Sequence, residues 1–126
     1  MPALEWTDRD VYLVCEKAFG LHAQGYHEQA ALLLDGLAVI DPGNAQIHDG
    51  LAAVFYSMDR LEESVQASTV ALQLDPACTH VRARRAEAYL RLGRTADAAA
   101  DCRLLTAGPG GARHHALARR VESAGR

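Results

Sequence analysis

The chain has 126 residues, of which 49% are hydrophobic, and a formal net charge of −3; this size and composition fit a single domain with a modest core. The charge is uneven, because residues 1–78 carry twelve acidic and three basic side chains whereas residues 79–126 carry four acidic side chains and ten arginines. No apolar run approaches the roughly 20 residues that cross a bilayer, and the start MPALEWTDRD lacks the basic and apolar regions of a signal peptide. From these features we expect a cytoplasmic protein with neither a signal peptide nor a membrane-spanning segment.

The first predicted helix covers about residues 8–24. Thr7 is placed to cap it, and Asp10 stands in the capping-box position. The helix has two apolar stripes, Val14, Ala18 and Leu21 on one and Tyr12, Cys15 and Phe19 on the other. One stripe is enough to pack on a neighbouring helix, so the second is free for another contact.

Three further helices follow in the first two thirds of the chain. The second predicted helix, about 28–40, is almost wholly apolar, and we expect it to be the most buried element. Asn44 is placed to cap the third, and a fourth over about 61–74 begins with two acidic residues, which the helix dipole favours there. Pro42 and Pro76 end the helices before them, at Asp41 and Asp75.

The last third predicts three more helices. The fifth, about 79–92, exposes four arginines: Arg82, Arg84, Arg85 and Arg91. Thr95 is placed to cap a sixth helix that ends near Leu105, before the glycine-rich segment 107–111. The final stretch, 112–124, has one apolar face, which suits a helix that closes a stacked array.

A period of 34 residues relates these helices to one another. Shifts of 34 place several small and turn residues in register: Gly25, Asp59 and Gly93; Ala18, Ala52 and Ala86; Ala30, Ser64 and Ala98; Pro42 and Pro76. This pattern resembles the tetratricopeptide repeat (TPR), whose period is about 34 residues. The resemblance implies an all-α TPR superhelix in one domain over 1–126, with repeats at about 11–44, 45–78 and 79–112 and a C-terminal capping helix.

In TPR arrays the first helix of each repeat lines a concave groove that binds a partner segment. The resemblance carries this role onto twelve positions, which we take as the candidate partner contacts: Tyr12, Cys15, Glu16, Phe19, His22, Asp49, Ala53, Tyr56, Arg84, Glu87, Leu90 and Arg91. The second apolar stripe of the first helix falls among them. A groove of this composition suits an extended, mainly apolar peptide segment, although the N-terminal residues folding over Tyr12 and Phe19 would also account for that stripe.

Three repeats and a terminal helix in a short acidic chain are similar to the class II chaperones of bacterial type III secretion. The similarity runs through LLLDGLAVIDPGNAQIHDGLAAVFYSMDRLEESV and RRAEAYLRLGRTADAA. It implies a chaperone that holds translocator proteins by a short apolar segment. Those chaperones use a longer N-terminal helical segment in dimer contacts, whereas only about ten residues precede the first repeat here. The resemblance therefore leaves a homodimer possible but does not require one. A general TPR adaptor or assembly scaffold is the alternative.

Other functions have less support in the sequence. No phosphate loop, dinucleotide motif, serine elbow or metal motif is present, so we expect neither an enzyme nor a cofactor. His114 and His115 are adjacent, and neighbouring positions on a helix point in different directions. Nucleic-acid binding through the arginines is disfavoured by the acidic net charge. The three cysteines are odd in number and lack CxxC spacing, so neither a disulfide framework nor a zinc site is indicated, and we expect them to be small buried residues.

TPR domains that bind the acidic C-terminus of heat-shock proteins share a clamp of two lysines, two asparagines and one arginine. The corresponding positions here hold Cys15, Phe19, Gly50, His80 and Arg84. Only the arginine matches, so the sequence predicts a different ligand.

Overall fold

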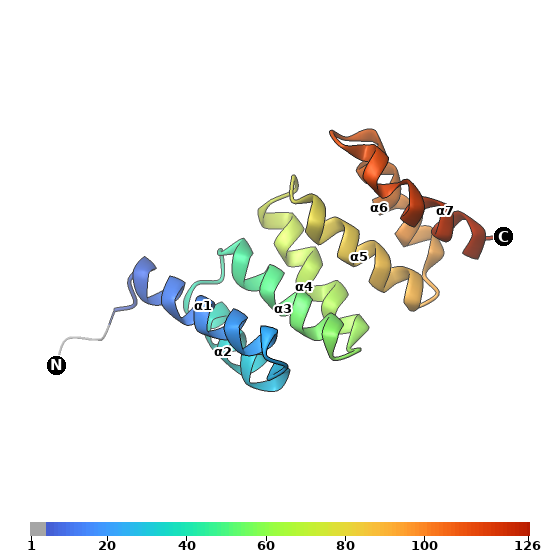
Figure 1. The fold of residues 1–126 in the computed structure, drawn as a ribbon. Coiled ribbons are helices and arrows are strands. Elements are labelled where there is room, and N and C mark those ends of the chain that lie inside the picture. The colour runs from blue at the N-terminus through green and yellow to red at the C-terminus, as the bar shows by residue number, and fades with distance from the viewer. Residues whose placement is uncertain (1–4) are drawn as a thin grey trace.

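The computed structural model describes residues 5–126, which form seven α-helices and one short 3₁₀ helix. The elements are α1 (Asp8–Ala23), α2 (His27–Ile40), α3 (Ala45–Ser57), α4 (Leu61–Leu74), α5 (Thr79–Arg91), α6 (Thr95–Ala107), η1 (Gly111–His114) and α7 (His115–Ala124). Consecutive helices pack as antiparallel pairs, and the pairs stack so that the two chain ends lie at opposite ends of the array (Figure 1). The predicted all-α repeat fold is therefore confirmed.

The turn inside each helix pair has the same backbone conformation in all three repeats. Gly25, Asp59 and Gly93 have φ values of 91°, 60° and 76°. This left-handed region is open to glycine at little cost and is tolerated by aspartate. The three residues are those that the 34-residue shift placed in register.

Most of the predicted helix ends are present. Thr7 and Asp10 form a reciprocal capping box, and the Asn44 side chain accepts a hydrogen bond from the Gln46 backbone N–H at 3.0 Å. Asp41 and Asp75 are the C-terminal caps of α2 and α4. The prediction for Thr95 is wrong, because Thr95 is the first residue of α6 and its hydroxyl makes no capping bond.

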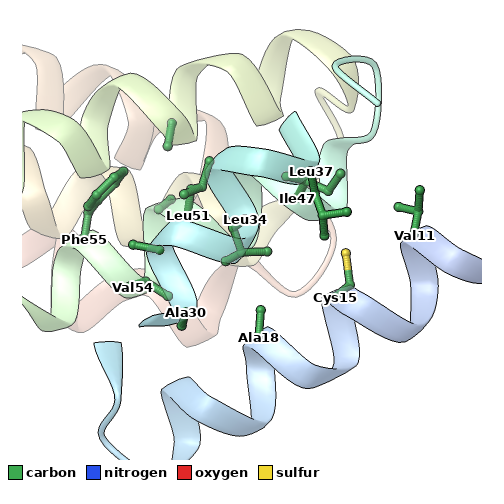
Figure 2. Close-up of a cluster of buried hydrophobic side chains, with 13 residues drawn as sticks. Val11, Cys15, Ala18, Ala30, Leu34, Leu37, Ile47, Leu51, Val54 and Phe55 are labelled. Atoms are coloured by element: carbon green, nitrogen blue, oxygen red, sulfur yellow. The ribbon is translucent and has the colours of Figure 1, made fainter. Parts of the chain in front are cut away.

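The larger hydrophobic core lies among α1, α2, α3 and α4. Ala18, Ala30 and Ala52, which stand at small-residue positions of the repeat, are completely buried there. Figure 2 shows Leu34, Ile47 and other aliphatic side chains filling the space between these close-packed helices. Small residues at the crossings let the backbones approach, and the larger side chains fill the remaining volume.

The expectation that α2 is the most buried helix is wrong. Leu32 and Val39 are 72% and 83% exposed, and only one stripe of α2 is buried: Ala30, Ala31, Leu34 and Leu37. α2 is the outer helix of the first pair, packed on α1 and α3, so its other apolar side chains face away from them. α3 and α4 bury more of their residues.

A second core lies at the C-terminal end, where α7 closes the array. Leu117 and Val121 of α7 pack with Ala86, Ala98, Cys102 and Leu105. The last helix begins as η1 and becomes α-helical at His115. Within residues 5–126, no helix has both the length and the apolar character needed to cross a membrane.

Candidate partner-binding surface

The twelve candidate residues all come from α1, α3 and α5, the first helices of the three pairs. Neighbouring first helices contact one another directly, α1 with α3 and α3 with α5. We call the surface formed by the accessible candidate residues on these three helices the inner surface. The structure therefore brings together side chains that are up to 79 positions apart in the sequence.

On α1, the candidates differ in accessibility. Tyr12 is 56% exposed and Glu16 is exposed, whereas Cys15 is only 2% exposed. Cys15 belongs to the core with Val11 and Ala18, so it offers no contact surface. The sequence pattern could not separate it from Tyr12 and Phe19, because all three belong to the same predicted apolar stripe.

Phe19 has a double role, as it is partly buried and packs against the main core. It lies over Gly50 of α3, where an added Cβ would come 2.6 Å from Phe19 Cε1. Gly50 therefore leaves the space that the aromatic ring fills. Phe19 stabilises the contact between α1 and α3 and also borders the inner surface.

His22 stands at the end of α1 and faces His27 at the start of α2, with the two Nδ1 atoms 2.9 Å apart. Burial, the nearby His27 and the Arg84 guanidinium together lower the pKa of His22. The ring is thus held in its neutral form more strongly than a free histidine. A neutral imidazole can both donate and accept a hydrogen bond at this end of the surface.

Three ion pairs cross the inner surface from one helix pair to the next. Arg84 Nη1 donates to Asp49 Oδ1 at 2.8 Å, Arg91 pairs with Asp59, and Arg120 of α7 donates to Glu87 Oε1 at 2.8 Å. The Glu87 carboxylate raises the pKa of the Arg120 guanidinium. Four candidate residues, Asp49, Arg84, Glu87 and Arg91, are therefore held by partners within the chain.

Two of the ion-pair partners, Asp59 and Arg120, are outside the candidate set, but their spacing from their partners in the sequence is informative. The paired residues are separated by 35, 32 and 33 positions, close to one repeat length. Asp59 lies in the turn after α3 and Arg120 on α7, so opposite charges about one repeat apart indicate pairs between stacked units even outside the first helices. A search for that spacing would have found both.

The remaining candidates have mixed surroundings. The Arg91 guanidinium lies over the Tyr56 ring, 5.3 Å from its centroid, an arrangement that a cation and an aromatic face favour. Leu90 is partly buried against the C-terminal core, and Ala53 is partly buried on α3. The inner surface thus has aromatic side chains at its α1 end, Tyr12 and Phe19, and a charged region over α3 and α5, which Arg120 of α7 borders.

The predicted exposed arginines of α5 are only partly confirmed. Arg91 is exposed, but Arg82, Arg84 and Arg85 are partly buried. Arg85 Nε donates to Asp101 Oδ2 at 2.9 Å, and Arg82 Nη1 lies 3.4 Å from Asp101 Oδ1. The excess of arginine in the last third of the chain is in large part neutralised by acidic residues of the same chain.

Comparison with known proteins places this fold among TPR structures. No protein-family model matches the chain, and no curated protein matches it significantly in sequence. Among solved structures, the Yersinia enterocolitica type III secretion translocator chaperone SycD is similar with a TM-score of 0.80 and 21% identity, over 94% of this chain and 83% of that chain. The structure of PcrH in complex with the chaperone-binding region of PopD is similar with a TM-score of 0.77 and 22% identity, over 96% of this chain and 92% of that chain.

A third structure, the first TPR domain of Spaghetti (RPAP3) bound to the HSP90 peptide SRMEEVD, gives a TM-score of 0.86 and 19% identity over 97% of this chain and 98% of that one. Similarity at this level of identity reports on the fold and not on the ligand. Together with the 34-residue period, it shows that the chain has the fold of tetratricopeptide-repeat proteins.

Proposed function

We propose that this protein binds an extended, mainly apolar segment of a partner protein along its inner surface, as a chaperone for translocator proteins of type III secretion. The exposed aromatic side chain of Tyr12, next to Phe19 at the α1 end, is the observation that carries the proposal. An exposed aromatic ring on a rigid helix offers a large apolar contact at low entropic cost. The charged region over α3 and α5 then favours polar or main-chain groups of the same segment.

The two chaperone structures support the choice of ligand class. SycD has been solved with a peptide of the translocator YopD, and PcrH with chaperone-binding regions of PopD and PopB. Both are built on the same helical repeat as this chain. By analogy, the ligand here is the chaperone-binding segment of a translocator, and a general TPR adaptor without a role in secretion is the alternative.

Binding of the acidic C-terminus of a heat-shock protein is disfavoured by the residues present. Of the five clamp positions, only Arg84 has a matching side chain, and that guanidinium is bound to Asp49. Cys15 is buried, and Phe19 fills the space over Gly50. A carboxylate arriving here would meet one engaged arginine and no lysine.

The test is affinity purification of the tagged full-length chain from its native host. We expect one partner in stoichiometric amount, with long apolar stretches, and a weakening of its affinity by about tenfold in Tyr12→Ser, the order of one lost aromatic contact. Leu32→Ser is the matched control, since Leu32 is also a large exposed side chain but lies on the outer helix α2. Circular dichroism should show equal helix content in both variants.

Two results would contradict the proposal. One is a partner whose affinity falls with Leu32→Ser and not with Tyr12→Ser, which would place the contact on the outer face. The other is tight binding of the peptide SRMEEVD in a direct titration, which would indicate a heat-shock protein ligand in place of a translocator.

A further inference from the structure

Cys78, His80 and Asp49 form a cluster at the junction of the second and third repeats. Cys78 Sγ lies 3.3 Å from Nδ1 and 3.6 Å from Nε2 of His80. His80 Nε2 is also 2.7 Å from Asp49 Oδ2. The cluster therefore joins the segment between α4 and α5 to the start of α5 and to α3.

These three residues line a cavity of about 430 Å³ between the start of α3, the end of α4 and the start of α5. Asp75, Asn44 and Gln46 also border it. The Cys78 side chain is thus reachable by a small molecule from solvent. The charged groups nearest the cluster are the Asp49 and Asp75 carboxylates and Arg84, which is bound to Asp49.

The arrangement indicates the kind of chemistry that is possible here. The sulfur is almost equally distant from both ring nitrogens, so it faces the imidazole ring and not one N–H direction. When the ring is protonated, it places a positive charge directly against the sulfur, and such a charge stabilises a thiolate. This geometry places an accessible thiol against an imidazole ring and lacks the directed N–H contact of a catalytic Cys–His pair.

A metal site is the competing interpretation, and the geometry disfavours it. His80 stands between the sulfur and the carboxylate and uses Nε2 toward Asp49, so the three donors do not converge on one point. Within residues 5–126 there is no cluster of three or more donor side chains that could hold a metal ion.

The other two cysteines provide an internal comparison. Cys15 and Cys102 are 2% and 4% exposed, and burial raises the pKa of both thiols. Cys78 is partly exposed, lines a cavity and has a histidine beside it. The three thiols of one chain thus have very different access to solvent.

We propose that Cys78 is a thiol-modification site that forms a mixed disulfide with a small neutral or cationic disulfide. The Cys78 thiolate attacks one sulfur of the small disulfide and forms the new S–S bond, while the other sulfur leaves as a thiolate and takes up a proton from water. The Asp75 carboxylate in the cavity has no ion pair among the described residues and repels an anionic reagent, which sets the charge preference.

The site borders the inner surface through Asp49 and Arg84. An adduct on Cys78 occupies the cavity beside this ion pair, so it should obstruct a partner segment there; this last step rests on the proposed function. The modification of Cys78 itself does not depend on the proposed function, and it can be measured on the free protein.

The experiment treats the purified full-length chain at pH 7 with cystamine, which is cationic, or with 3,3′-dithiodipropionate, which is anionic and of similar length. Intact and peptide mass spectrometry follow the adducts over time. We expect one cysteamine per chain, on Cys78, formed about tenfold faster than on Cys15 or Cys102, and slower modification by the anionic reagent. Cys78→Ser should remove the fast adduct.

A second variant tests the role of the ring. His80→Gln keeps a side chain of similar size and removes the imidazole ring beside the sulfur, and the His80 side chain is 62% exposed, so we expect the fold to be retained. The rate at Cys78 should fall by about threefold, because the gain in thiolate from a neighbouring charge is partly offset by lower nucleophilicity. Equal labelling of the three cysteines, or an unchanged rate in His80→Gln, would overturn the proposal.

Discussion

Two serines one turn apart in α4, Ser64 and Ser68, are both completely buried but differ in their hydrogen bonding. Ser64 Oγ donates to the Ala52 carbonyl at 2.8 Å and so ties α4 to α3. Ser68 Oγ has no partner among the described residues. A buried hydroxyl without a partner loses its bonds to water and gains none in return.

We therefore expect opposite effects from the same substitution at these two positions. Ser64→Ala should lower the free energy of unfolding by about 1 kcal/mol through the lost hydrogen bond. Ser68→Ala should leave stability unchanged or raise it by up to about 1 kcal/mol, since it removes an unsatisfied polar group. Urea unfolding of both variants against the parent chain measures this, and a loss in Ser68→Ala equal to that in Ser64→Ala would show that its hydroxyl is bonded after all.

At the scale of elements, α5 and α6 are joined by a nearly buried ion cluster. Asp101 is 2% exposed and accepts from Arg85 at 2.9 Å and 2.6 Å, with Arg82 at 3.4 Å. Hydrogen bonding to Asp101 raises the pKa of the Arg85 guanidinium. Removing one member of such a cluster leaves charges with little access to water.

Asp101→Asn should destabilise the protein by about 3 kcal/mol, because two partly buried guanidinium groups lose their counter-charge. Asp97→Asn on the same helix is the matched control; its pair with Arg94 is exposed and should contribute less than about 1 kcal/mol. Thermal unfolding at low and high salt separates the two cases. Similar losses in both variants would mean that the Asp101 cluster contributes no more than a surface pair.

The helices themselves could be predicted from the sequence, because caps and prolines are local signals and the 34-residue period repeats them along the chain. The exposure of single side chains could not, since it depends on neighbours that local patterns do not specify. The apolar pattern of α2 predicts burial all round, but in the described part of the chain no helix covers Leu32 and Val39. The arginines of α5 are expected to be exposed from the sequence alone, because no local signal indicates that Asp101 of α6 binds Arg82 and Arg85.

For the whole molecule, α7 is the element that closes the array. Its Leu117 and Val121 are buried against α5 and α6, and without them Cys102 and Leu105 would face water. Terminal helices of this kind keep repeat arrays soluble. The 34-residue pattern does not extend to α7, so its role rested on its apolar face alone.

A chain that ends at Gly110 should lose about 3 to 6 kcal/mol of stability, the order of the burial of two aliphatic side chains, and should bind the dye ANS. Arg119→Ala in the full-length chain is the control, because Arg119 is exposed on the same helix. Differential scanning calorimetry and ANS fluorescence measure the two effects. An unchanged melting midpoint in the shortened chain would show that α7 is not a stabilising cap.

The candidate surface was predictable as a set of helices but less so as a set of contacts. The repeat resemblance selected α1, α3 and α5, and the structure places their candidates side by side. It also shows that Cys15 is part of the core and that Phe19 is shared between core and surface, because Gly50 leaves room for its ring. Such a contact between residues 31 positions apart depends on the stacking of two repeats.

The ion pairs between successive units form only when the repeats stand in their present order. A 34-residue shift takes Arg84 to Gly50 and Arg91 to Ser57, so a second copy of residues 45–78 inserted after the first would offer no arginine to either Asp49 or Asp59. The three units share one scaffold but are not interchangeable modules. Duplication, deletion or shuffling of a repeat, which the backbone geometry would permit, would leave acidic side chains unmatched at the new junction.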